Sequence, residues 1–293
     1  MEWQQLIIES GPPGPEILEE ALFAHGALSV TLLDAADQPI LEPAPGATPL
    51  WPEVRIVALF SADKRLDEIV RAIETAIGLS LPENEIEVLP DQDWRRAWMK
   101  DFKPMRFGDR LWICPGGQEP TVTDGIIVEL DPGLAFGTGT HPTTALCLEW
   151  LERSDMQGLN VLDYGCGSGI LAIAALKLGA SSVTAADIDP QALIATKNNA
   201  QQNNIDSGLT ICDPESIPQQ SYQRLVANIL ADPLIKLAPR LAEFAAPGAL
   251  IGLSGVLKEQ SSAVEQRYQT WFDMDPAVLM DDWVLLCGTR RTE

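Results

Sequence analysis

The stretch VLDYGCGSGI, residues 161–170, decides the fold of the second half of this chain. An apolar run leads into Asp163, and glycines follow at alternate positions, Gly165, Gly167 and Gly169. A glycine backbone lets a ligand approach closely, because no side chain stands in the way. The pattern predicts a buried strand that stops at a tight turn and opens a helix over ILAIAALKLGA. An ordinary glycine-rich turn in an α/β domain is the alternative.

A second apolar run, SSVTAADIDP, ends at Asp187, eighteen residues after Gly169. A carboxylate at this place can accept hydrogen bonds from both hydroxyls of a ribose. The glycine spacing is G-x-G-x-G, whereas a dinucleotide site has G-x-G-x-x-G and seats a pyrophosphate on the helix N-terminus. The pattern resembles motif I of class I S-adenosylmethionine-dependent methyltransferases, which implies S-adenosylmethionine as the cofactor. The sequence D-I-D-P then falls where their second acidic motif lies.

The length indicates two domains, and the net charge limits the class of partner. A chain of 293 residues is long for one domain. Its net charge of −22 argues against nucleic acid as a direct partner, because phosphate binding needs a basic face. A basic protein is the natural complement of this charge. On charge alone, however, the solubility of an acidic cytosolic enzyme is the favoured explanation.

Cysteine usage and hydropathy indicate a cytoplasmic protein with reduced thiols. The five cysteines form no C-x-x-C pair, and with two histidines a zinc site is not expected, so we predict no metal. No apolar stretch approaches the length of a membrane-spanning helix, and the start MEWQQLIIES does not look like a signal peptide. No coiled coil or repeat calls for assembly, so a monomer is expected.

Residues 1–92 are expected to form a small α+β domain of their own. Strand-like and helical runs alternate in the order β-α-β-β-α-β, which is the ferredoxin-like arrangement. The segment before Trp94 carries 18 acidic and 4 basic residues. We interpret it as a substrate-recognition domain, with a purely structural appendage as the alternative.

A basic, aromatic segment follows, and we expect residues 93–108 to form a helical linker. Trp94, Trp98 and Phe102 are spaced by four, so one helical face would be aromatic, and Pro104 would end the helix. Packing of these rings between the domains is favoured over contact with substrate or ligand.

Residues 109–293 are expected to form a Rossmann-like domain, a mainly parallel sheet with an antiparallel end. LWICP and GIIVELDP are predicted to form a leading hairpin, and AVLMDDWVLLCGTR a terminal one. Ligands of such sheets bind beyond the carboxyl ends of the strands. Gly165, Asp187 and Asn228 all fall at expected strand ends.

The loop of residues 131–144, DPGLAFGTGTHPTT, is rich in Gly, Thr and Pro and precedes a helix. It is expected to fold over the ligand as a lid, although a plain connector is possible. Thr143 or Thr144 is predicted to cap the helix. His141 is placed as a loop-structuring residue in preference to a general base.

The order of these motifs, FGTGTHPTT, DYGCGSGILAIAA, DIDPQAL and ANILADPL behind a small acidic domain, resembles the bacterial ribosomal protein methyltransferase family. The resemblance covers essentially the whole chain. It implies methyl transfer from S-adenosylmethionine to lysine ε-amines and the N-terminal α-amine of a large-subunit ribosomal protein. It also implies that the small domain recognises the substrate and that the two domains move about the linker.

By motif position, the resemblance implies that Thr144, Gly165, Gly167, Asp187 and Asn228 contact the cofactor. Asn228 is also the predicted catalytic residue, which would orient the acceptor amine. This chain has Ile229 and Leu230 where amine methyltransferases often have Pro-Pro, so the detail of that role stays open. The remaining alternatives are a methyltransferase for another protein or a small amine, a non-catalytic cofactor-binding module, and a nicotinamide dehydrogenase, which the glycine spacing disfavours.

Overall fold

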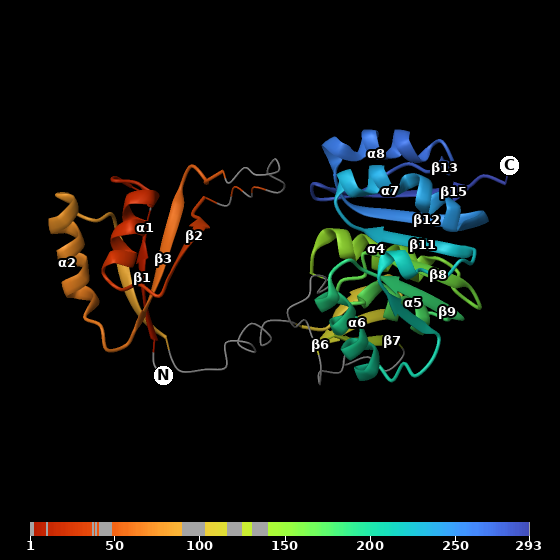
Figure 1. The fold of residues 1–293 in the computed structure, drawn as a ribbon, viewed down its shortest axis with the longest axis horizontal. Coiled ribbons are helices and arrows are strands. Elements are labelled where there is room, and N and C mark those ends of the chain that lie inside the picture. Colours follow the sequence, from red (N-terminus) through yellow and green to blue (C-terminus); the bar gives the residue numbers. More distant parts are fainter. Residues whose placement is uncertain are drawn as a thin grey trace. The chain divides into compact units, whose positions relative to one another are not determined.

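The computed structural model describes residues 3–9, 11–36, 38, 40, 49–89, 103–115, 125–130 and 140–292. The chain divides into two compact units, Met1–Ala97 and Trp98–Glu293. Each unit is described by itself below, with the elements labelled in Figure 1.

The small unit is a four-stranded antiparallel sheet with two helices (Figure 1). Its elements in chain order are β1 (Trp3–Ile8), α1 (Pro15–Ala24), β2 (Ser29–Asp34), β3 (Val54–Ser61), α2 (Leu66–Ile77) and β4 (Asn84–Leu89). The strand order is β2-β3-β1-β4, so the ferredoxin-like arrangement is confirmed. In β3, buried residues alternate with more exposed ones, because successive side chains of a strand point to opposite faces. The buried face packs on α1 and α2 through a core that includes Leu6, Leu22, Ile56, Phe60 and Ile73.

The large unit is built on an eight-stranded sheet. Its strands are β8 (Asn160–Tyr164), β9 (Ser182–Ala186), β10 (Leu209–Cys212), β11 (Tyr222–Asn228), β12 (Ala245–Leu257), β13 (Phe272–Met274), β14 (Val278–Met280) and β15 (Trp283–Arg290). The order is β10-β9-β8-β11-β12-β15-β13, with β14 paired to β15. The first five of these strands are parallel and β15 is antiparallel to β12, which confirms a mainly parallel sheet with an antiparallel end.

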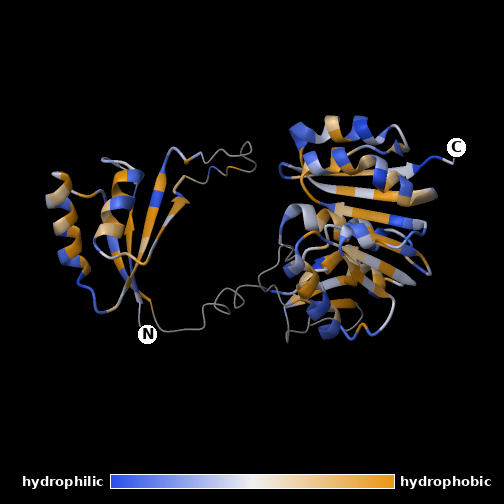
Figure 2. Ribbon diagram, viewed as in Figure 1, coloured by the Kyte–Doolittle hydropathy of each residue, from blue (hydrophilic) through white to orange (hydrophobic). Residues whose placement is uncertain are grey.

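Helices cover both faces of this sheet. They are α4 (Pro142–Arg153), α5 (Ile170–Lys177), α6 (Pro190–Gln202), α7 (Ala231–Phe244) and α8 (Ser261–Tyr268), with short 3-10 turns at Pro214–Ser216 and Lys258–Gln260. One core cluster joins the sheet to α4, α5 and α6, and a second joins it to α7 and α8. Because both faces are covered, strands such as β8 are buried along almost their whole length, and hydrophobic residues run through the sheet (Figure 2).

The predicted leading hairpin is wrong. Three strands, β5 (Met105–Phe107), β6 (Leu111–Pro115) and β7 (Ile126–Leu130), form a separate sheet. LWICP and GIIVELDP supply β6 and β7, but these two strands pair in parallel, and the antiparallel partner of β6 is β5. Single strands give no sign of their relative direction, because a buried strand has the same pattern in either orientation. The terminal hairpin, by contrast, is present as β14 and β15.

The expected linker 93–108 lies mostly outside the described residues, including Trp94, Trp98 and Phe102. Its last part is not helical, because β5 pairs with β6 and buries Phe107. No helix among the described residues is long and apolar enough to cross a membrane.

Candidate active site

The three predicted strand ends come together at one edge of the large sheet. Gly165 follows β8, Asp187 follows β9, and Asn228 is the last residue of β11. Strand β8 lies between β9 and β11, so the chain winds in opposite directions from it. This reversal is the position at which open α/β sheets bind their ligands, beyond the carboxyl ends of the strands.

The turn after β8 needs its glycines. Gly165, Gly167 and Gly169 have φ values of +82°, +53° and +80°, a region that side chains with a Cβ rarely adopt. The Gly165 and Cys166 amides both donate to the Ala186 carbonyl oxygen, at 2.7 and 3.1 Å, and this ties the turn to the end of β9.

The turn is also tightly packed. A Cβ at Gly165 would lie 2.3 Å from Cγ2 of Ile229, the residue that follows β11. A Cβ at Gly169 would lie 2.7 Å from Cγ2 of Thr196 in α6. The spaces that glycine leaves at these two positions are therefore what allow the neighbouring segments to approach.

Asp187 is fixed in an orientation suited to a ribose. Its Oδ2 accepts from the Gly167 amide and its Oδ1 from the Asp189 amide, each at 2.9 Å. A carboxylate oxygen has two acceptor sites, so each oxygen can still accept from one hydroxyl. The half-buried carboxylate and the close backbone of the glycine turn fit the adenosine part of S-adenosylmethionine.

Asn228 and Thr144, which are 84 residues apart, are hydrogen-bonded. Thr144 lies in the first turn of α4 and is only 1% exposed. Its Oγ1 accepts from Nδ2 of Asn228 at 3.3 Å. The amide therefore donates through its nitrogen, and its carbonyl oxygen is the atom suited to accept from an acceptor amine.

His141, and neither Thr143 nor Thr144, caps α4. Its Nδ1 accepts from the Thr143 amide at 3.4 Å and lies 2.8 Å from Oγ1 of the same residue. Its ring meets Trp283 edge-on, with centroids 4.9 Å apart. Burial lowers the pKa of His141, which favours the neutral ring whose Nδ1 can accept. The helix begins two or three residues earlier than the predicted caps Thr143 and Thr144 require, and the geometry fits a loop-structuring role.

Asp163 is a buried carboxyl group that, from the sequence, was placed only as a neighbour of the glycines. It is fully buried, and its Oδ2 accepts from the Ala172 amide of α5 at 3.0 Å. Among the described residues, its Oδ1 has no hydrogen-bond partner. Burial raises the pKa of Asp163 to about 7, and the negative charge of Asp187 adds to the increase. The signal in the sequence was a carboxylate inside an otherwise apolar strand.

Ser254 and Gly255 hold the segment after Asn228. The Ile229 amide donates to the Ser254 carbonyl oxygen at 3.1 Å. Gly255 has a φ of +80°, and a Cβ there would lie 2.5 Å from the Ile229 carbonyl oxygen. This pair was not predicted from the sequence, although a Ser-Gly step inside the apolar run of β12 indicates close backbone approach.

Part of the expected lid, residues 131–139, lies outside the described residues. Its end is described, and there Thr144 meets Asn228. Among the residues that the structure describes, no three His, Cys, Asp or Glu side chains are grouped so that they could hold a metal ion.

Comparisons with known proteins agree with this geometry. The family model described as ribosomal protein L11 methyltransferase (PrmA) matches residues 2–291. A ribosomal protein L11 methyltransferase of Hahella chejuensis is 51% identical over 290 residues, 99% of each protein. One of Pseudomonas putida strain GB-1 is 50% identical over 292 residues, 99% of this chain and all of the relative.

A crystal structure of a ribosomal protein L11 methylase from Lactobacillus delbrueckii subsp. bulgaricus is also similar. It has a TM-score of 0.60 and 34% identity, and it covers 65% of this chain and all of its own. The resemblance noted in the sequence and the class of enzyme and cofactor that it implied are confirmed. The chain belongs to the ribosomal protein L11 methyltransferase (PrmA) family.

Proposed function

We propose that this protein transfers methyl groups from S-adenosylmethionine to amines of the large-subunit ribosomal protein L11. The observation that carries the proposal is the match of the family over residues 2–291, together with Gly165, Asp187 and Asn228 at adjoining strand ends. The acceptors are lysine ε-amines and the N-terminal α-amine. The small acidic domain, residues 1–92, recognises the substrate and is joined by the linker 93–108 to the catalytic domain, 109–293.

The cofactor contacts that we propose are Thr144, Gly165, Gly167, Asp187 and Asn228. Each carboxylate oxygen of Asp187 has one acceptor site that is not used by the Gly167 or Asp189 amide. These two sites accept hydrogen bonds from the ribose hydroxyls. When bound, S-adenosylmethionine supplies an electrophilic methyl group. The glycine turn provides backbone without side chains where the cofactor must come close.

The catalytic task of the protein is to prepare the amine. A lysine side chain has a pKa near 10.4 and an α-amine a pKa near 8. At neutral pH, deprotonation therefore costs more free energy for the lysine than for the α-amine. The Asn228 carbonyl oxygen accepts a hydrogen bond from an N–H of the neutral amine. This hydrogen bond directs the lone pair of the amine nitrogen toward the methyl group. The hydrogen bond of Asn228 to Thr144 fixes the side chain for this purpose. Alignment of this kind supplies much of the rate in such transfers.

We also propose that the protein works as a monomer in the cytoplasm, without direct contact to nucleic acid. The net charge of −22 supports the last point, because it repels a polyanion.

Labelled S-adenosylmethionine and ribosomal proteins from a strain that lacks this enzyme test the function. Label is expected on L11 alone. Label on another protein or on a small amine would replace L11 as the substrate. The absence of any label would indicate a non-catalytic cofactor-binding protein. Calorimetry that measures binding of a nicotinamide dinucleotide tests the dehydrogenase alternative.

Calorimetry on Asp187→Ala tests the cofactor site. Loss of two hydrogen bonds to a charged acceptor, at about 1.5–3 kcal/mol each, should weaken S-adenosylmethionine binding about 100-fold or more. Asp206→Ala, which removes an exposed carboxylate of the same domain, is the control. Unchanged binding by a folded Asp187→Ala protein would refute the ribose role.

A further inference from the structure

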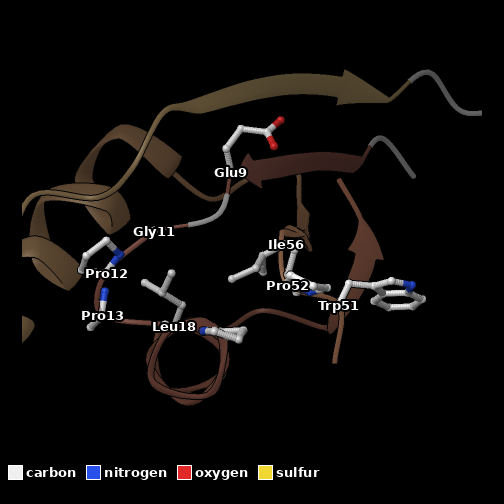
Figure 3. A pocket seen from close by; sticks show the side chains of 11 residues that line it. Glu9, Gly11, Pro12, Pro13, Leu18, Trp51, Pro52 and Ile56 are labelled. Atoms are coloured by element: carbon white, nitrogen blue, oxygen red, sulfur yellow. The ribbon is translucent and has the colours of Figure 1, made fainter. Parts of the chain in front are cut away.

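The small unit contains a cavity of about 540 Å³ that is lined by residues of that unit alone. Its floor is formed by the buried side chains of Leu18 from α1 and Ile56 from β3. The loop of Pro12 and Pro13 lies on one side, and Trp51 and Pro52 lie on the other (Figure 3). A preformed hollow of this size is in the range of ligand pockets, roughly 300–1,000 Å³, and exceeds what one side chain fills.

The lining is suited to an apolar occupant. Apart from Glu9, every lining residue is glycine, proline, tryptophan or aliphatic. The Glu9 carboxylate is already paired with the Arg55 guanidinium, at 2.7 Å. No cation among the lining residues is available for an anionic metabolite. A small polar ligand needs several convergent polar groups to orient it, and this lining does not supply them.

The chain neighbours of the lining residues add exposed apolar and acidic side chains to the same segments. Ile17 and Leu50, each adjacent in sequence to the lining, are 50% and 42% exposed. Glu16, next to the lining residue Pro15, and Glu53, next to Pro52, are also exposed. An apolar hollow formed by segments that also carry exposed carboxylates is complementary to apolar side chains flanked by basic ones.

The charge of residues 1–93 favours the same partner. Before residue 94 the chain has 18 acidic residues and four basic ones, Arg55, Lys64, Arg65 and Arg71. All three arginines are paired with carboxylates of this unit. The remaining field is therefore negative, which attracts a basic protein and repels RNA.

We propose that this cavity, whose lining includes Leu18, Trp51 and Ile56, is the anchor site for the protein substrate. It holds a short segment of L11 that carries apolar side chains and is flanked by Lys or Arg. The inference rests on the proposed function and adds to it the place on the small unit where the substrate is gripped. Aromatic residues in desolvated pockets commonly carry most of the binding free energy of an interface, which gives Trp51 the leading part.

The test uses the full-length protein, purified L11 and S-adenosylmethionine. Trp51→Ala removes one wall, and Glu53→Lys reverses the charge of the exposed residue between the lining residues Pro52 and Val54. Each is expected to raise the KM for L11 about tenfold or more, while calorimetry finds the affinity for S-adenosylmethionine unchanged. The matched controls are Leu79→Ala, an apolar side chain 48% exposed beyond α2, and Glu85→Lys on β4, and these should change KM less than about twofold.

The possible outcomes separate the two proposals. If the wild type methylates L11 but both cavity variants behave like their controls, the cavity is not the anchor site. A second result would also overturn the proposal that the cavity holds a protein segment. That result is an RNA fragment that competes with L11 for the wild-type protein but not for the Trp51→Ala variant. If the wild type does not methylate L11, the proposed function itself fails. Glu53→Lys changes an exposed residue, so it keeps the test decisive if Trp51→Ala does not fold.

Discussion

Replacing Asp163 by asparagine should remove a large pH dependence of stability. Burial raises the pKa of this carboxyl from 3.8 to about 7, and asparagine keeps an oxygen that can accept from the Ala172 amide. The native state thus holds the proton more tightly than the unfolded state does. The free energy of unfolding therefore falls as the pH rises from about 4 through 7, and this group has no further effect at higher pH.

The size of the effect follows from the two pKa values. At about 1.4 kcal/mol per pH unit, the difference between 3.8 and about 7 amounts to about 4 kcal/mol. Most of it, about 3 kcal/mol, falls between pH 5 and pH 8.5. The asparagine variant is neutral throughout, so its stability relative to the wild type should increase by that amount over this interval.

Urea unfolding of both proteins at several pH values measures this difference directly. Asp206→Asn, a neutralised exposed carboxylate of the same domain, is the control and should follow the wild type. A carboxyl ¹³C titration of the wild type should show one aspartate with a midpoint near 7. A constant difference between Asp163→Asn and the wild type from pH 5 to pH 8.5 would refute the reasoning.

Three further predictions concern packing, charge and thiol reactivity. Gly255→Ala should reduce kcat about tenfold or more, because its Cβ would lie 2.5 Å from the Ile229 carbonyl oxygen and displace the end of β11, where Asn228 lies; an unaltered kcat would contradict this. Arg110→Ala should cost about 1–3 kcal/mol in urea unfolding, since it removes the 3.2 Å ion pair of Glu152, whose side chain is 6% exposed. Iodoacetamide should label Cys212 first, because three of the other cysteines are buried and burial raises the pKa of Cys287 to about 12; mass spectrometry of partly labelled native protein identifies the site.

The elements and their types could be predicted because each depends on local pattern. The period-2 runs of the small domain, the glycines after β8 and the apolar runs of the parallel strands are visible in any short window of the sequence. The direction in which β6 and β7 pair was predicted wrongly, since strand polarity depends on how the intervening chain crosses, which neither strand records. The prediction that the helical linker extends to residue 108 was also wrong at its end, where β5 lies. The strand β5 is stabilised by its partner β6 and not by its own sequence.

The sequence by itself determined the family, the cofactor class and the strand ends at which Gly165, Asp187 and Asn228 lie. Each of these follows from residue types at fixed spacing, which local backbone geometry translates directly into structure. Only the tertiary structure decided that Thr144 meets Asn228 and that Gly255 holds Ile229 in place. Only it showed that the prolines near residue 12 and Trp51 enclose one cavity. Contacts between segments far apart in the chain are set by packing of the whole domain, for which no short stretch of sequence carries the information.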